Sequence, residues 1–302
     1  MSSYLLNDVC EFSELDRYHH CYNSFNPEAN SRLNPSSSPE YVVFRTFLGG
    51  ICFLKSGEDS IIFDKNYYLI EPQNQFLDST YLWAEVGNIL APLMLDEQKF
   101  LNSFRGRYLE NKKFYESFLL EISYSIAASK NERYVESFLH IYRGLEHMSY
   151  ALPLMYLKRS DGYKKTYEAF KSFFGDDNSQ SEMGFGKKFI RSIMDSNIYS
   201  ANVKMDFSEH PEQHYNALKK IFKSDSDFNF NDDLKQVETI FGRVFDLVVK
   251  VRNMYFHHLY SKNYSLDGRE IVLPNKFFEV FVDIGMCFLA NFYFIIFSSK
   301  YE

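Results

Sequence analysis

Residues 251–260 read VRNMYFHHLY and close a long stretch of helical periodicity. From residue 232 to about residue 260 the apolar positions recur every three or four residues, which predicts one helix of about eight turns. Arg252, Asn253 and His257 place polar side chains in a helix that is regular enough to belong to a bundle core. This decapeptide is therefore the first candidate for a functional site.

Composition narrows the class of protein. The chain has 302 residues, of which 45% are hydrophobic and 18% aromatic, so it can bury a core and is not a disordered chain. A net charge of −7 argues against a broadly basic surface that binds duplex DNA nonspecifically. The cysteines form no C-x-x-C pair, and the N-terminus lacks a basic start followed by an apolar run. We expect a cytoplasmic protein without a disulfide framework.

The stretch 277–297 is apolar for about the length of a membrane span. Glu279, Asp283 and Asn291 interrupt it, and a charged side chain at the centre of a bilayer costs about 3 kcal/mol or more. We expect a buried helix and no membrane association.

The first part of the chain differs in character from the rest. Residues 1–40 are polar and rich in turn signals, and Cys10, His19, His20 and Cys21 fit no zinc spacing, so no metal and no cofactor is expected. Between residues 41 and 70 the β-rich runs YVVFRTF, ICFLKS and SIIFDKNYYLI predict a three-stranded antiparallel meander.

From about residue 79 onward the periodicity is helical. Helices are predicted over 80–95, 96–128, 134–157, 161–177, 187–197, 211–223 and 232–260, with a last helix that begins at Pro274. The expected fold class is mainly α. Residues 1–112 would form an N-terminal β-containing region for sensing or regulation, and residues 113–302 a C-terminal helical bundle.

The polar residues of the decapeptide suit chemistry on phosphate. Asn253 and His257 are four residues apart and share one helix face, and Arg252 can border the same groove. Histidine exchanges protons near neutral pH, and arginine stabilises the charge of a phosphorane, so these parts suffice for metal-free RNA cleavage. The simpler interpretation is an ordinary helix end, where cationic side chains are favoured.

The segment RNMYFH, residues 252–257, resembles the R-x4-6-H motif of HEPN (higher eukaryotes and prokaryotes nucleotide-binding) ribonucleases. In that family a polar residue commonly follows the arginine, as Asn253 does here, and the motif lies late in a long helix of an all-α bundle. The resemblance covers roughly residues 115–302. It implies a homodimer with a composite active site, which cuts RNA without metal and leaves a 2',3'-cyclic phosphate and a 5'-hydroxyl. Many family members are toxins or abortive-infection effectors in antiviral defence.

The catalytic histidine has two candidates. His257 fits the shorter spacing and is preferred, and His258 fits the longer one. With Tyr260, His258 also gives an H-x-Y sequence similar to the motif tail of HEPN toxins that pair with minimal nucleotidyltransferases, in which the tyrosine accepts AMP. Those toxins have R-x4-H-x-Y, so Tyr260 is out of register with His257, and AMP acceptance is not carried over.

A second group of polar residues lies on the helix predicted over 134–157. Its members share one face at helical spacing and are Glu136, His140, Arg143, Glu146 and His147. Some HEPN proteins are similar in having a polar residue on an earlier helix that orients the motif, which makes Arg143 and Glu146 supporting candidates and His147 an alternative catalytic residue. The simpler interpretation is a ladder of exposed ion pairs, worth about 0.3 kcal/mol per pair.

Two functions follow as expectations. The resemblance implies a metal-independent endoribonuclease with RNA as substrate and with a regulatory protein or ligand bound at the N-terminal region. The alternative is a non-catalytic, HEPN-like helical scaffold that binds a nucleotide or a protein partner.

Overall fold

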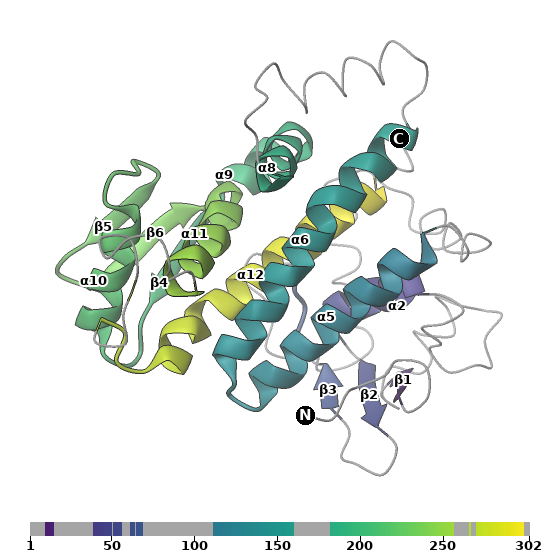
Figure 1. Ribbon diagram of the computed structural model, residues 1–302, viewed down its shortest axis with the longest axis horizontal. Helices are drawn as coiled ribbons and strands as arrows, with labels where there is room; N and C mark the ends of the chain where they lie inside the picture. The colour runs from purple at the N-terminus through teal and green to yellow at the C-terminus, as the bar shows by residue number, and fades with distance from the viewer. Residues whose placement is uncertain are drawn as a thin grey trace.

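The computed structural model describes residues 10–14, 39–49, 51–55, 61–63, 65–68, 111–159, 182–256, 266 and 270–298. Over these residues the protein is mainly helical, as predicted, and it carries short antiparallel sheets (Figure 1).

Two long helices organise the core. Helix α6 (Tyr134–Arg159) packs against α12 (Pro274–Ser298), which lies behind it in Figure 1. Helix α5 (Lys112–Lys130) packs along one side of α6, and α11 (Val244–Phe256) contacts both α6 and α12. Helix α2 (Pro39–Leu48) packs against α5 and α12. The site region around α11 is thus built on α6 and α12.

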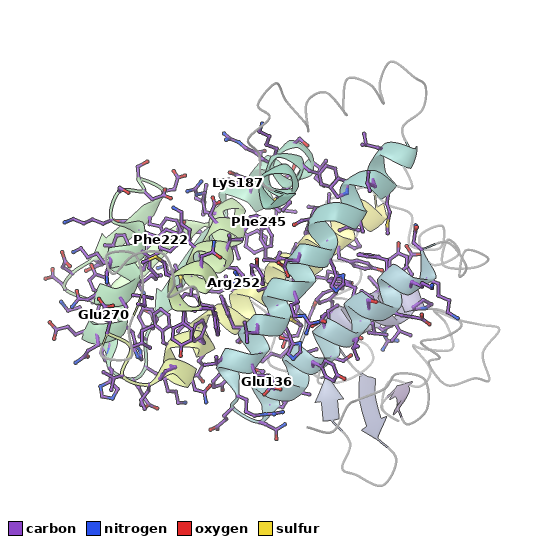
Figure 2. All side chains as sticks on the ribbon, in the orientation of Figure 1. Glu136, Lys187, Phe222, Phe245, Arg252 and Glu270 are labelled. Carbon is purple, nitrogen blue, oxygen red and sulfur yellow. The ribbon has the colours of Figure 1, made fainter. Side chains whose placement is uncertain are left out.

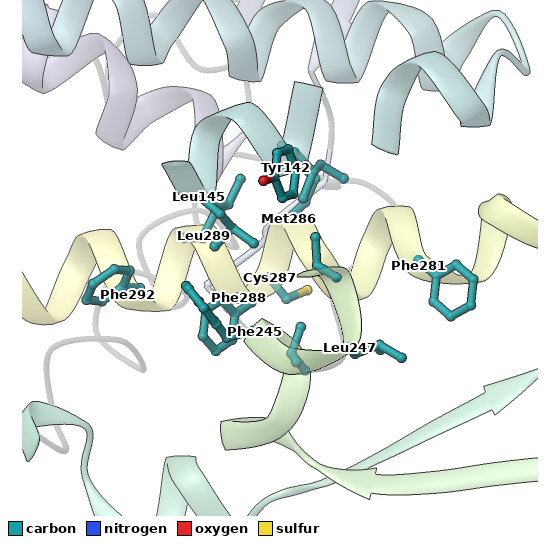
Figure 3. Close-up of a cluster of buried hydrophobic side chains, with 14 of the residues drawn as sticks. Tyr142, Leu145, Phe245, Leu247, Phe281, Met286, Cys287, Phe288, Leu289 and Phe292 are labelled. Atoms are coloured by element: carbon teal, nitrogen blue, oxygen red, sulfur yellow. The ribbon is translucent and has the colours of Figure 1, made fainter. Parts of the chain in front are cut away.

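Helical spacing of apolar residues explains this packing. On α6, Phe138, Ile141, Leu145 and Met148 recur at three or four residues and are fully buried. Side chains from α6, α11 and α12 meet in the cluster of Figure 3, where Phe245 of α11 lies near Phe288 of α12 at 6.4 Å between ring centroids.

Helix α12 contains the apolar stretch that resembles a membrane span. The segment Pro274–Ile295 is long and apolar enough to cross a bilayer, and 78% of its most apolar window is buried among the other elements. Its composition is therefore explained by packing in the core. The expected absence of membrane association stays a prediction.

A three-stranded antiparallel sheet lies in the C-terminal half. Its strands are β4 (Asn202–Asp206), β5 (Phe228–Asn231) and β6 (Gln236–Ile240), in the order β4-β6-β5. Met205 of β4 is opposite Val237 of β6, and both side chains are buried. Helix α10 (Pro211–Phe222) connects β4 to β5 in the chain and contacts α11.

The prediction of one helix from residue 232 to 260 is wrong in its first part. Residues 236–240 form β6, in which Val237 and Thr239 are buried and alternate with half-buried neighbours. The turn before β6 is held by Asn231, whose Oδ1 accepts hydrogen bonds from the backbone N–H groups of Asp233 and Leu234. After a short 3-10 turn, η3 (Phe241–Arg243), the helix starts only at Val244.

A second three-stranded antiparallel sheet has the order β1-β2-β3 and consists of β1 (Cys10–Glu14), β2 (Ile51–Lys55) and β3 (Ile61–Phe63). Strands β2 and β3 fall inside the predicted meander. The run YVVFRTF does not form a strand but lies in helix α2, because its β-forming residues are buried on several sides against α5 and α12. Tertiary packing overrides the local β-propensity there.

The remaining helix predictions divide into three groups. The helices predicted over 134–157 and 211–223 and from Pro274 are confirmed as α6, α10 and α12. Helix α5 covers the end of the range 96–128, and the range 187–197 is divided between α8 (Glu182–Ile193) and α9 (Ser196–Ser200). The ranges 80–95 and 161–177 lie outside the described residues. The domain division at residue 112 stays a prediction.

Candidate functional site

Arg252 lies on α11 where this helix faces α6 (Figure 2). Its guanidinium carbon is 4.5 Å from the centroid of the Tyr142 ring on α6. Its Nη1 donates a hydrogen bond of 3.1 Å to Oδ1 of Asn253. The first two residues of the predicted motif are therefore joined to each other, and the arginine is seated on an aromatic ring.

The packing of α11 explains this position. Val244, Leu247, Val248 and Val251 are fully buried and form the face of α11 that enters the core. Arg252 follows Val251 by one residue, which is about 100° round the helix, so its side chain leaves the core at the edge nearest α6.

A charge network fixes the start of α11. Arg243, which is 15% exposed, pairs with Asp225, Asp227 and Asp246. Lys250, two turns further along, also pairs with Asp225, at 3.1 Å. These contacts tie α11 to the turn between α10 and β5 and so stabilise the helix that carries Arg252.

Tyr142 links Arg252 to Glu146. Glu146, which lies four residues later on α6, interacts with the tyrosine hydroxyl and raises its pKa. Burial is the largest cause of the raised pKa of Tyr142, the interaction with the negatively charged Glu146 raises it further, and the positive charge of Arg252 acts in the opposite direction. The phenol therefore stays protonated at neutral pH. Of the two predicted supporting residues, Glu146 is the one that the structure connects to Arg252, through Tyr142.

Arg143 is paired elsewhere. Its Nη2 lies 3.1 Å from Oε1 of Glu121 on α5, and His140 Nδ1 lies 2.7 Å from Oε2 of the same carboxylate. The structure thus divides the predicted polar face of α6 between two neighbours, α5 and α11. A direct role of Arg143 beside Arg252 stays a prediction.

The interpretation as an ion-pair ladder fits one member of this face. Glu136 pairs at 2.9 Å with Arg133, the residue before the start of α6, and both side chains are about half exposed. His140 and Arg143, in contrast, pair across helices with Glu121. His147 is half-buried on α6, and its role as an alternative catalytic residue stays a prediction.

The predicted catalytic histidines cannot be placed in this geometry. His257, His258 and Tyr260 lie outside the described residues, so the choice between the two histidines stays open.

Sequence reasoning missed two residues. Glu121 was overlooked, although an acid between Phe118 and Ile122 interrupts an apolar stripe and is a recognisable signal. Tyr142 was overlooked as well, because nothing in the local sequence indicates that its ring contacts an arginine on another helix.

Neither a group of metal-binding residues in the described part of the chain nor a similar protein identifies what this site does. Across the ranges that the structure describes, no group of three or more His, Cys, Asp or Glu residues could hold a metal ion. Comparisons of the chain with known protein families, with curated proteins and with solved structures found no match.

Proposed function

We propose that the protein is a metal-independent endoribonuclease of HEPN type, which acts as a homodimer in the cytoplasm as an antiviral or toxin effector. Arg252 stabilises the charge that develops on the phosphate, His257 transfers a proton, and Asn253 orients the arginine. The N-terminal region serves sensing or regulation.

The reaction is a transesterification within the RNA. A ribose 2'-oxygen attacks the neighbouring phosphorus as a base takes its proton, and the bond from phosphorus to the 5'-oxygen breaks as that oxygen receives a proton. The products are a 2',3'-cyclic phosphate and a 5'-hydroxyl. Arginine N–H groups stabilise the extra negative charge of the pentacoordinate transition state.

The observation that supports the proposal is the contact between the Arg252 guanidinium and the Tyr142 ring. The guanidinium carbon lies over the Tyr142 ring, 4.5 Å from its centroid, and this contact holds the group in place. A guanidinium binds phosphate oxygens through its N–H donors. The bond from Nη1 to Asn253 restricts rotation of the same side chain. Donors that are held in place before the reaction need no reorganisation in the transition state.

The test compares wild-type protein with His257→Ala and Arg252→Ala on total RNA, with sequencing of RNA 5'-hydroxyl ends. We expect new 5'-hydroxyl ends with wild type and their loss with either variant. Arg191→Ala is the matched control, because Arg191 is an exposed arginine on α8. Equal numbers of new ends from wild type and both variants would refute the proposal.

In the scaffold alternative, the contact between Arg252 and Tyr142 has only a structural role. Arg252 stacked on Tyr142 would then be only a clamp between α6 and α11. In that case Arg252→Ala lowers the midpoint of thermal unfolding, while wild-type protein generates no 5'-hydroxyl ends at any concentration. Measuring unfolding and cleavage on the same samples separates the two functions.

A further inference from the structure

The interface between α5 and α6 contains a polar cluster that the proposed reaction does not use. Glu121 of α5 has a side chain that is only 5% exposed, and it contacts His140 and Arg143 of α6. A carboxylate at a helix interface is costly unless it is paired, and here both of its oxygens are paired.

The geometry fixes the imidazole of His140. Its Nδ1 donates to Oε2 of Glu121 at 2.7 Å, and the Tyr124 ring lies 5.1 Å from it between centroids, at an interplanar angle of 45°. A carboxylate on Nδ1 selects the ring tautomer and directs Nε2 away from the carboxylate. His140 is thus held in the way in which proteins hold a histidine that acts through Nε2.

Arg143 lies beside the same imidazole. The two side chains bind different oxygens of one carboxylate, so the guanidinium and the imidazole are neighbours. Within the described part of the chain Nε2 of His140 has no hydrogen-bond partner, and the imidazole is 15% exposed. Arg143 gives Glu121 one contact at 3.1 Å, while 57% of its side chain is exposed. Donors of both side chains are therefore available to one ligand.

The charges of the cluster favour an anion that binds together with a proton. Glu121 and Arg143 neutralise each other, so a protonated His140 gives the cluster a net charge of +1. The titratable groups that face His140 are Glu121 and Tyr124 from α5 and Arg143 from α6, with Glu136 and His147 one to two turns away on α6. A tetrahedral oxyanion matches the donors of His⁺ and arginine.

We propose that Glu121, His140 and Arg143 form a binding site for a phosphate group on the α5–α6 face, in which Arg143 and Nε2 of protonated His140 donate to phosphate oxygens and Glu121 positions both. The site does not depend on cleavage at Arg252. A nucleotide monoester and the phosphodiester backbone of RNA share this chemistry, and the experiment distinguishes them.

The test follows the histidine ring signals of the full-length protein by NMR while inorganic phosphate is added. The His140 signal is assigned by its loss in His140→Gln. We expect saturable shifts of this signal as phosphate is added. Arg143→Gln should weaken binding about tenfold or more, since it removes a charged hydrogen bond. Arg133→Gln removes the same charge immediately before α6, outside the cluster, and should bind like wild type.

Further experiments distinguish a nucleotide from RNA as the phosphate-containing ligand and check that the shifts come from the proposed site. AMP supplies a monoester, and a 2'-O-methyl oligoribonucleotide with a 5'-hydroxyl supplies only diesters; tighter binding of either identifies the source. In Arg252→Ala the His140 shifts should persist, which separates this site from the proposed active site. Glu121→Gln keeps the volume of the side chain and should weaken binding. Shifts that do not saturate, or equal affinity in Arg143→Gln and Arg133→Gln, would overturn the proposal.

Discussion

Protonation of His214 should affect the stability of the fold. It lies fully buried on α10, with its ring 5.6 Å from Phe207 and 5.5 Å from Phe277 between centroids. Burial lowers the pKa of His214, and the charge of the nearby His210 lowers it further, against a weaker opposing effect of Glu209. The folded protein therefore keeps this imidazole neutral, whereas the unfolded chain binds a proton at the ordinary pKa of about 6.5.

The free energy of unfolding should consequently fall in mild acid. Above the ordinary pKa both states are neutral at this position and the stability is complete; as the pH falls through about 6.5 toward the lowered pKa, the unfolded state binds more protons and stability is lost. Urea unfolding at several pH values should show a smaller loss in His214→Phe than in wild type. His210→Gln should retain most of the loss, because burial is the larger cause. The same pH dependence in His214→Phe and wild type would contradict this account.

Among the helices, the contact of α6 with α12 depends on a glycine. A Cβ on Gly285 would lie 2.8 Å from Cγ2 of Ile141, which is fully buried. At Gly144 the nearest atom would be Cδ1 of Leu289 at 3.2 Å, the end of a side chain that can move.

We expect Gly285→Ala to destabilise the protein by about 1 to 3 kcal/mol, since it forces the two helices apart. Gly144→Ala should cost less, because the nearest atom there is farther away and is the movable end of the Leu289 side chain. Urea unfolding of both variants measures the difference. A Gly285→Ala protein at least as stable as Gly144→Ala would show that the helices do not depend on this close approach.

The elements also show what sequence periodicity can predict. Helices α6 and α12 were predicted correctly because a period of 3.6 persists over many turns. The segment that became β6 and η3 was wrongly assigned to a helix, since Val237, Ile240 and Phe241 fit a helical stripe, whereas the buried residues of β6, Val237 and Thr239, alternate as in a strand. Only the pairing of β6 with β4 and β5 decides between them, and such pairing is not a local property.

The prediction of site residues was also limited to features that are local in the sequence. Arg252 and Asn253 were found because their spacing is local, and the structure joins them by a hydrogen bond. The contacts of Arg252 with Tyr142 and of Arg143 with Glu121 cross between helices and could not be predicted from spacing on one helix.

At the scale of the whole molecule, the proposed composite active site requires two copies of the chain. One protomer supplies one Arg252 and one His257, and the proposed composite site combines two motif helices. Sedimentation should therefore show a dimer, and cleavage per protomer should fall on dilution as the dimer dissociates. Constant cleavage per protomer by a species that sediments as a monomer would exclude the composite site.

The central claim is that Arg252, held on Tyr142, stabilises negative charge on a phosphate of RNA. The most direct measurement is the rate at which Arg252→Ala cleaves RNA, compared with Arg191→Ala under the same conditions. We predict a rate about 100-fold or more below that of the control, the loss expected when a prepositioned donor to the transition state is removed. Equal rates for the two folded variants would contradict the claim.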